Sequence, residues 1–246
     1  MIKLYDKTRY HCKQSPNEDM PRLPIRCCWL APSAGGKTTA IQHLILNPQM
    51  YSGCFERFYI CNPSIHLDAI WNPLKKYITE KTGLGPFYDE FNKERLADFV
   101  KHHEKVVAQQ KRVNSHTLCG VLIILDDMAA TAVMRNPRGK LARLAVTGRH
   151  SCASLILPSQ SYKAIHPRIR TQFNLLRLWR QCQQKEFQSL QDEVSAVARP
   201  DRIREMFEEA LREPYSFLSI NFHMFRDQPE EAFEVRFERA LNSKRI

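Results

Sequence analysis

The stretch APSAGGKTT, residues 31–39, decides the fold class of this chain. It nearly matches the pattern G-x-x-x-x-G-K-[ST], in which small residues let backbone N–H groups turn inward around a phosphate. An apolar run at 24–30 precedes the stretch, and residues 37–46 have the pattern of a helix that stops near an Asn-Pro pair. The order of strand, glycine-rich turn and helix predicts a phosphate-binding loop, with a turn that binds nothing as the alternative.

The positions of this loop have distinct expected roles. Lys37 can reach the β- and γ-phosphates, and Thr38 offers a hydroxyl to Mg²⁺, while the following helix points the positive end of its dipole at the anion. Ala31 stands where the pattern has its first glycine, and we expect the loop to tolerate the extra methyl group if φ is negative there. The predicted nucleotide-binding residues are Pro32, Ser33, Ala34, Gly35, Gly36, Lys37, Thr38 and Thr39.

A pair of carboxylates follows the most apolar segment of the chain, LCGVLIIL at 118–125. A continuous apolar run of this kind is typical of a strand buried on both faces at the centre of a parallel sheet. Asp126 is therefore predicted to hold Mg²⁺ through its water shell, and Asp127 to accept a proton from an attacking water or to orient that water. The alternative is a strand-end turn in which an aspartate caps a helix.

Polar residues flank a further buried strand, ASLILP at 153–158. Gln160 follows this strand and is a candidate to hydrogen-bond the attacking water and sense the γ-phosphate, with a simple polar cap as the alternative. Arg149 precedes the strand, so it is expected at the opposite end of the sheet from Gln160. There it is poorly placed for its own nucleotide and is a candidate arginine finger for a neighbour's nucleotide in a ring; the alternative is a surface arginine at a helix C-terminus.

Strand-like and helix-like segments alternate along the chain, which predicts a three-layer α/β P-loop fold with a mainly parallel, right-handed central sheet flanked by helices. The predicted strands are at 24–30, 55–61, 118–125, 153–158, 173–180 and 215–222. The predicted helices are at 37–46, 66–78, 89–114, 141–146, 184–194 and 201–211. One ATPase domain is expected at 23–228, with an arm outside the core at 1–22 and a charged tail at 229–246 whose pattern allows a helix.

The composition narrows the partners and the compartment. The 246 residues include 37 basic and 26 acidic ones, a net charge of +11, which favours a polyanion partner such as nucleic acid or an anionic membrane; solubility alone is the alternative. Eight cysteines without a C-x-x-C pair make a zinc site unexpected. No signal peptide or membrane-length apolar run is recognised, so we expect a reducing compartment and no secretion.

Three segments together resemble the genome-packaging ATPases of poxviruses and other large double-stranded DNA viruses, including virophage-like relatives. These segments are APSAGGKTT, VLIILDDM at 121–128 and, above all, GRHSCASLILPSQSYKAIHPRIR at 148–170. In that family a Gly-Arg-His turn, a buried strand, a glutamine and a loop with arginine recur in this order. The resemblance spans about 24–180 and departs at Ala31, and residues from about 181 onward match nothing in it.

The resemblance implies an ASCE-type, RecA/FtsK-like core of the FtsK–HerA group of P-loop motors. It implies a homo-oligomeric ring, a hexamer or a pentamer, that uses ATP and Mg²⁺ to push double-stranded DNA through the vertex of a preformed viral capsid. By the motif match, Lys37 and Thr38 bind nucleotide and metal, and Asp126 holds Mg²⁺. Asp127 becomes the catalytic acid, Gln160 the sensor and Arg149 the finger. The implied location is the host cell cytoplasm, a viral factory or the virion.

Two basic loops, at 134–140 and 162–170, are the candidate DNA contacts. Lysines and arginines in the loops of a ring pore would grip phosphates without reading sequence, and solvated surface charge is the alternative. The candidate residues are Arg135, Arg138, Lys140, Lys163, Arg168 and Arg170.

Two rival functions stay open from the sequence. A small-molecule or nucleotide kinase would need an arginine-rich lid and no second acid beside Asp126. A nucleotide-gated DNA-binding or capsid-linking protein with little turnover would tolerate the loss of Asp127. The second acid, Gln160 and the net charge of +11 favour the DNA-translocating motor over both.

Overall fold

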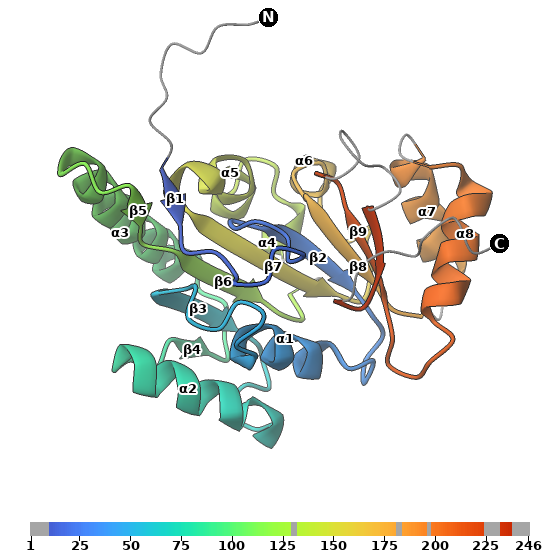
Figure 1. The fold of residues 1–246 in the computed structure, drawn as a ribbon, viewed down its shortest axis with the longest axis horizontal. Helices are drawn as coiled ribbons and strands as arrows, with labels where there is room; N and C mark the ends of the chain where they lie inside the picture. The colour runs from blue at the N-terminus through green and yellow to red at the C-terminus, as the bar shows by residue number, and fades with distance from the viewer. Residues whose placement is uncertain (1–9, 129–131, 181–183, 196–197, 224–231, 238–246) are drawn as a thin grey trace, which may run out of the picture.

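A mixed sheet with helices on both faces forms the body of the molecule (Figure 1). The computed structural model describes residues 10–128, 132–180, 184–195, 198–223 and 232–237. Within these residues the main sheet has eight strands, and a second sheet pairs β1 (His11–Cys12) with β5 (Thr117–Leu118). The predicted three-layer α/β fold with a mainly parallel sheet is confirmed.

The strand order places the segment that ends at Gln160 between the phosphate-loop strand and the carboxylate strand. From one edge to the other the strands are β10 (Phe233–Val235), β9 (Leu218–Asn221), β8 (Leu175–Leu178), β2 (Arg26–Leu30), β7 (Ala153–Ser159), β6 (Val121–Leu125), β3 (Arg57–Cys61) and β4 (Phe87–Tyr88). The six strands from β8 to β4 pair in parallel. Strands β9 and β10 pair antiparallel at one edge.

The central strands are apolar along their whole length because helices cover both of their faces. All five residues of β6 are buried. Alternate side chains enter opposite layers: Ile123 packs in one core cluster and Ile124 in the other. This is the pattern expected of a parallel sheet that is buried on both sides. The packing on both faces holds β6, and therefore the start of the segment that carries the two carboxylates, in place.

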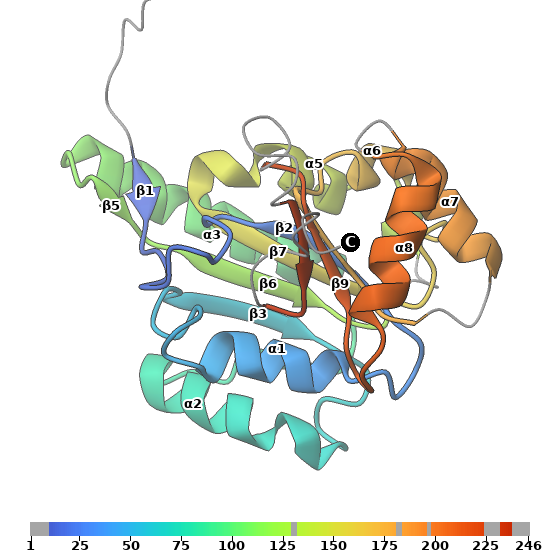
Figure 2. The ribbon, with the colours of Figure 1, turned by 45° about the vertical axis from the view of Figure 1, so that its right-hand side comes forward.

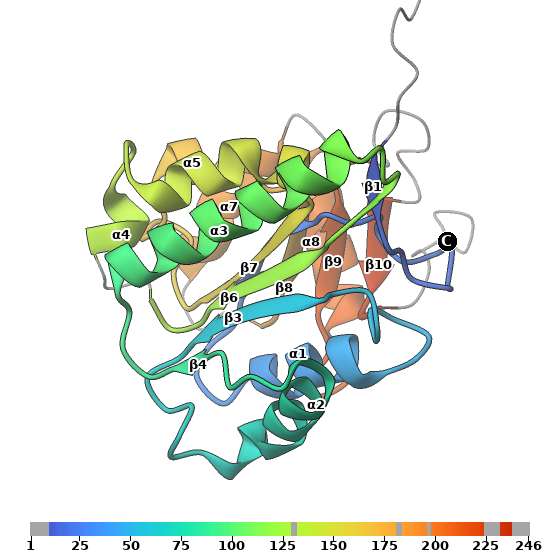
Figure 3. The ribbon, with the colours of Figure 1, turned by 90° about the vertical axis from the view of Figure 1, so that its left-hand side faces the viewer.

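The helices form two unequal layers. Figure 3 shows α1 and α2 on one face of the sheet and α3, α4 and α5 on the other. Helices α7 and α8 pack in the same core cluster as α5. Helix α8 lies beside β9, and α7 packs on α8 (Figure 2). The helices are α1 (Lys37–Leu46), α2 (Asn72–Thr82), α3 (Lys93–Arg112), α4 (Ala132–Arg135), α5 (Lys140–Thr147), α6 (Pro167–Arg170), α7 (Gln184–Val194) and α8 (Pro200–Ala210), with 3₁₀ turns η1 (Ala69–Trp71) and η2 (Gly148–Ser151). No helix in the described part of the chain is long and apolar enough to cross a membrane.

Two terminal segments differ from expectation. Cys12 and Met20 lie in the core cluster around α1, so this part of the predicted arm packs against the domain. Residues 233–235 of the predicted tail form β10, a strand of the main sheet, with Phe233 and Glu234 buried. Strand β1 in the predicted arm has two residues, and β10 in the predicted tail has three. Strands this short produce no alternation of apolar and polar residues, which is why neither strand was predicted. Residues 1–9 and 238–246 lie outside the described part of the chain.

Candidate functional site

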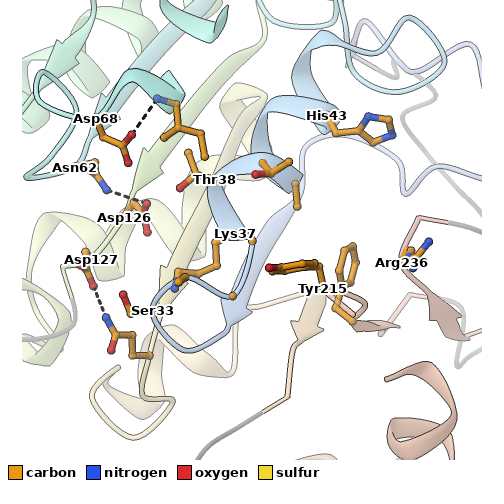
Figure 4. Close-up of a pocket in the computed structure, with 18 of the residues that line it drawn as sticks. Ser33, Lys37, Thr38, His43, Asn62, Asp68, Asp126, Asp127, Tyr215 and Arg236 are labelled. Atoms are coloured by element: carbon orange, nitrogen blue, oxygen red, sulfur yellow. Dashed lines mark hydrogen bonds between the residues drawn. The ribbon is translucent and has the colours of Figure 1, made fainter. Parts of the chain in front are cut away.

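A cleft of about 1040 Å³ opens at the edge of the sheet where the parallel strands end (Figure 4). Parallel strands direct their carboxyl ends to one edge, where ligands of open α/β sheets bind. The loop after β2, the carboxylates after β6 and Gln160 after β7 all line this cleft. The structure therefore brings together the predicted loop, both predicted acids and the predicted sensor.

The phosphate loop owes its shape to two glycines. Gly36 has φ of 90° and immediately precedes α1, in a conformation that side chains rarely adopt. A Cβ on Gly35 would lie 3.0 Å from the carbonyl oxygen of Pro32 and 3.3 Å from Cβ of Ala31. Ala34 takes up a left-handed φ of 57°, at a cost of about 1–2 kcal/mol for an L-residue. Strained positions of this kind persist where the surrounding structure holds them, and they cluster at ligand-binding sites.

Ala31 fits its position without strain. Its side chain is fully buried, and its φ is not positive, so the condition for replacing the first glycine of the pattern is met. Its backbone N–H donates to the carbonyl oxygen of Ser159 on β7 at 3.1 Å, which ties the start of the loop to the strand that carries Gln160. The methyl group therefore fills core space and leaves the phosphate side of the loop unaltered.

Lys37 closes back over the loop. Its Nζ donates to the carbonyl oxygens of Ala31 at 3.1 Å and Pro32 at 2.9 Å. Burial lowers the pKa of this ammonium, and the carboxylates of Asp126 and Asp127 partly offset the effect. A desolvated cation held between two carboxylates and a phosphate loop is arranged to attract a polyphosphate.

Asp126 is the buried acid of the pair. Asn62, which follows β3, donates through Nδ2 to Asp126 Oδ2 at 2.9 Å. Burial raises the pKa of the Asp126 carboxyl to about 6, and the Lys37 ammonium and the Asn62 hydrogen bond counteract this rise. The other oxygen, Oδ1, is buried and has no hydrogen-bond partner among the described residues. Thr38 lines the same cleft as Asp126. A buried carboxylate oxygen without a hydrogen-bond partner, together with a hydroxyl in the same cleft, fits an Mg²⁺ site.

Asp127 points to a different partner from Asp126, as expected for two adjacent acids at a strand end. It is exposed, and its backbone has φ of 59°, a left-handed conformation that Asp tolerates better than most residues. Gln160 Nε2 donates to Asp127 Oδ1 at 3.1 Å, which joins the predicted sensor to the predicted catalytic acid. Among the described residues, Gln160 is the hydrogen-bond donor to Asp127, and it uses one of the two carboxylate oxygens.

Arg149 lies away from the cleft. It belongs to η2 at the amino end of β7, whereas Gln160 follows the carboxyl end. The seven residues of β7 separate the two ends by roughly 20 Å. Arg149 is exposed and forms no ion pair with a described carboxylate; its Nε donates to His150 Nε2 at 3.3 Å. It therefore lies too far from the cleft of its own chain to contact a nucleotide bound there.

Helix α3 holds the Arg149 turn in place. His103 is 1% exposed, and its Nε2 donates to the carbonyl oxygen of Ser151 at 2.7 Å. Lys111 Nζ donates to the carbonyl oxygen of His150 at 2.9 Å. A Cβ on Gly148 would lie 3.1 Å from the carbonyl oxygen of Ala153, so the turn also packs tightly on β7. These contacts make η2 a rigid platform for an exposed arginine.

A pH dependence of stability follows from His103. Burial lowers the pKa of its imidazole to about 4, against an ordinary value of 6.5. Between these values the unfolded chain binds a proton that the folded chain does not, so the free energy of unfolding falls as the pH is lowered from 6.5 to 4. We expect the parent to lose about 3 kcal/mol more than a His103→Gln variant over this range, measured by urea unfolding. If the free energy of unfolding falls equally in the two proteins, the lowered pKa of His103 is not the cause of the pH dependence.

The two basic loops meet beside the cleft edge. The backbone N–H of His166 donates to the carbonyl oxygen of Met134 at 2.8 Å, and Arg135 and Lys163 line one hollow of about 390 Å³. Arg138, Lys140 and Arg168 are exposed as well. Arg170 differs from these candidates: its side chain is 15% exposed, lies over the Tyr162 ring at 4.9 Å and pairs with Glu193 at 3.4 Å. Because its guanidinium is already engaged by Glu193 and the Tyr162 ring, Arg170 is a poor candidate for a contact to DNA.

Several cleft residues were missed by sequence reasoning. Asn62 follows β3, which lies next to β6, so the rule that parallel strands end together contained the signal for it. His43 lines the cleft from α1, about one and two-thirds turns after Lys37. Tyr215, Arg236 and Phe237 come from the part of the chain that resembled nothing known, and no local pattern marks them.

Comparison with known proteins supports the fold at low sequence identity. No protein-family model and no curated protein matches the chain. Among solved structures, the genome packaging NTPase B204 from Sulfolobus turreted icosahedral virus 2, in complex with AMP, is similar with a TM-score of 0.57 and 16% identity over 86% of this chain and 96% of that chain. This chain has the fold of that packaging NTPase.

Two other solved structures agree with this result. B204, the DNA-packaging ATPase from Sulfolobus Turreted Icosahedral Virus, is similar with a TM-score of 0.57 and 12% identity over 87% of this chain and 97% of that chain. The pCW3 conjugation coupling protein TcpA, with ATPγS, has a TM-score of 0.53 and 14% identity over 80% of this chain and 57% of that chain. The resemblance to packaging ATPases that the motifs predict is thus matched by a likeness of the whole fold.

Proposed function

We propose that this protein is an ATP-hydrolysing motor that translocates double-stranded DNA and packages a viral genome into a preformed capsid. One arrangement carries the proposal: Asp127 and Gln160 are hydrogen-bonded to each other in the same cleft as Lys37, the phosphate loop and the buried Asp126. A site built only to bind phosphate needs no second acid. A second acid held by a glutamine is what hydrolysis by water requires.

Different residues of the chain have different roles in the proposed hydrolysis. The loop N–H groups and Lys37 hold the β- and γ-phosphates, and Gln160 and Asp127 orient a water toward the γ-phosphorus. The water oxygen forms the new bond to phosphorus while the bond between phosphorus and the β–γ bridging oxygen breaks. The water's proton passes to the Asp127 carboxylate, and ADP and phosphate leave. When bound to Thr38 and Asp126, Mg²⁺ would supply positive charge beside the phosphates.

The exposed Arg149 fits a ring of identical subunits. Its place roughly 20 Å from its own Gln160 supports action between subunits, since a head-to-tail ring can bring one subunit's η2 to the next subunit's cleft. In this ring Arg149 would stabilise the charge that builds up on the transferred phosphate. We therefore include a homo-oligomeric ring, a hexamer or a pentamer, in the proposal.

A short path joins the hydrolytic site to the basic loops. Lys163 lies three residues after Gln160 along the same segment. Glu186 of α7 clamps the residues between them: its Oε1 accepts from Ser161 Oγ at 2.7 Å and its Oε2 from the backbone N–H of Tyr162 at 2.9 Å. A shift of Gln160 on phosphate release would move Lys163 with it. Lys163, Arg168, Arg135, Arg138 and Lys140 are the proposed contacts to DNA phosphates.

The setting of the proposal is a virus-infected cell. The host cell cytoplasm or a viral factory is the proposed location, with the capsid vertex as the docking partner of the ring. The packaging role of B204, whose fold this chain shares, supports this setting.

The test is the rate of ATP hydrolysis with and without double-stranded DNA. We expect DNA of mixed sequence to stimulate the parent, and a Lys163→Ala/Arg168→Ala variant to lose most of the stimulation while it keeps its DNA-free rate. The slope of log affinity for DNA against log salt should become shallower by about one unit for each phosphate contact removed. Affinity and slope are measured by fluorescence anisotropy of labelled DNA.

A control variant with the same change in charge distinguishes direct contacts to DNA phosphates from the general attraction of a basic protein for DNA. Lys76→Ala/Lys81→Ala removes the same two charges from α2, on the opposite face of the sheet, and should leave DNA stimulation unchanged. DNA-independent phosphoryl transfer to a small acceptor would instead identify a kinase. DNA binding that depends on ATP but produces no phosphate would identify a nucleotide-gated binding protein.

A further inference from the structure

The end of the cleft away from the carboxylates is lined with aromatic rings that the hydrolytic mechanism does not use. Tyr215, Phe217 and Phe237 line this end, together with His43 of α1 and Arg236. In Figure 4, Lys37 lies between Asp126 and Asp127 on one side and Tyr215 and Arg236 on the other. The cleft therefore has a phosphate end and an aromatic end, joined along the first turns of α1.

Tyr215 is the most unusual of these rings. Its side chain is 76% exposed, although tyrosine normally buries most of its ring, and its backbone has φ of 58°. The ring lies directly against the phosphate loop, because a Cβ on Gly36 would be 3.5 Å from Tyr215 Cδ1. A strained backbone that presents an exposed aromatic ring to a cleft indicates a binding surface.

Arg236 holds the Tyr215 turn and is not itself available for phosphate. Its guanidinium donates through Nε to Ser216 Oγ at 3.3 Å and through Nη2 to Glu213. Its backbone N–H donates to the carbonyl oxygen of Phe217 at 2.9 Å. Residues on both sides of Tyr215 are thus fastened to the segment after β10, which keeps the ring in place.

Phe237 is braced from behind by a buried arginine. The guanidinium of Arg177, a residue of β8 that is 1% exposed, lies 4.4 Å from the centroid of the Phe237 ring and also contacts Trp29 and Phe217. Phe237 meets Phe217 edge-on at 5.1 Å and lies 5.7 Å from the His43 ring. Its half-buried ring is therefore positioned by three neighbours and has its remaining surface on the cleft.

We propose that Tyr215 and Phe237 form the base-binding side of the cleft, where the purine of a nucleoside triphosphate stacks on the Tyr215 ring. This inference rests on the proposed nucleotide function and assigns a role to the segment after residue 211. Stacking on an aromatic face tolerates any base, so the site adds affinity without choosing between adenine and guanine. The phosphates of the same ligand then extend along α1 to Lys37.

The test compares ligands with and without a base, by titration calorimetry on the full chain with Mg²⁺. We expect Tyr215→Ala to weaken ATP and GTP binding about tenfold each and to leave the affinity for inorganic tripolyphosphate within twofold of the parent. Tyr215→Phe keeps the ring and should restore ATP binding. Lys37→Ala should weaken ATP and tripolyphosphate alike, because it removes a phosphate contact.

Tyr10→Ala, at a tyrosine outside the cleft, is the matched control and should bind ATP as the parent does. Circular dichroism and thermal unfolding verify that each variant folds. Equal weakening of ATP and tripolyphosphate by Tyr215→Ala would mean that the ring only supports the phosphate loop, and it would overturn the base site. Unchanged ATP affinity would do the same. A parent that binds ATP through Tyr215 yet never hydrolyses it would keep the base site and overturn the motor.

Discussion

An Asp127→Asn variant is expected to bind ATP as tightly as the parent and to hydrolyse it at least 100-fold more slowly. A positioned general base contributes about 10²–10⁴-fold to a rate, and asparagine cannot accept the water's proton. The substitution changes little else. Asparagine keeps an oxygen that can accept the Gln160 hydrogen bond, and it tolerates the left-handed backbone that this position requires. Phosphate release measures the rate, and calorimetry measures the ATP affinity.

The control for this prediction removes one negative charge elsewhere. Asp98 is exposed on α3 and does not line the cleft, so Asp98→Asn should hydrolyse ATP at the parent rate. A parent-like rate in Asp127→Asn would show that another group accepts the proton. It would also remove the main argument for a hydrolase over a nucleotide-gated binding protein.

The second large effect is expected for Arg149→Ala, which should slow ATP hydrolysis about 1000-fold while ATP affinity changes little. An arginine finger stabilises charge that appears only in the transition state, so its loss affects the rate far more than binding. Arg143→Ala is the matched control, because Arg143 is exposed on the adjoining α5 and should leave the rate unchanged.

Mixing variants tests the direction in which Arg149 acts. Arg149→Ala subunits retain an intact cleft, and Lys37→Ala subunits retain an intact finger. If Arg149 acts across an interface, some interfaces in a mixed ring contain both intact halves, and hydrolysis recovers. Differently tagged subunits verify that mixed rings form. Mixed rings without recovered hydrolysis would place Arg149 outside the catalytic site.

The long central strands and two of the helices were predictable because each carries its own local signals. The helix predicted at 37–46 has the same bounds as α1, which a glycine begins and an Asn-Pro pair ends. The helix predicted at 184–194 likewise coincides with α7. The predicted central strands contain the observed β2, β3, β6 and β8, because a continuous apolar run is sufficient to identify a strand buried on both faces.

Contacts between distant segments were harder to predict. That Asp126, Asp127 and Gln160 share one edge follows from parallel strand order, so their meeting with the phosphate loop could be anticipated. The partnership of Arg170 with Glu193 could not be anticipated, because it depends on where α7 packs. Strand β10 could not be predicted either, because it is a strand only through its pairing with the edge strand β9, which depends on the tertiary structure.

The sequence by itself determined the chemistry that is available: a strained glycine loop with a lysine, two acids after a buried strand, and a glutamine after another. These are local patterns, in which a residue type and its neighbours along the chain already imply a conformation and a charge. Only the tertiary structure decided which residues from the later part of the chain join this group and which are kept from it. It placed Tyr215 against Gly36, and it paired Arg170 with Glu193. Such contacts depend on the side chains that packing brings into reach, and no local pattern encodes them.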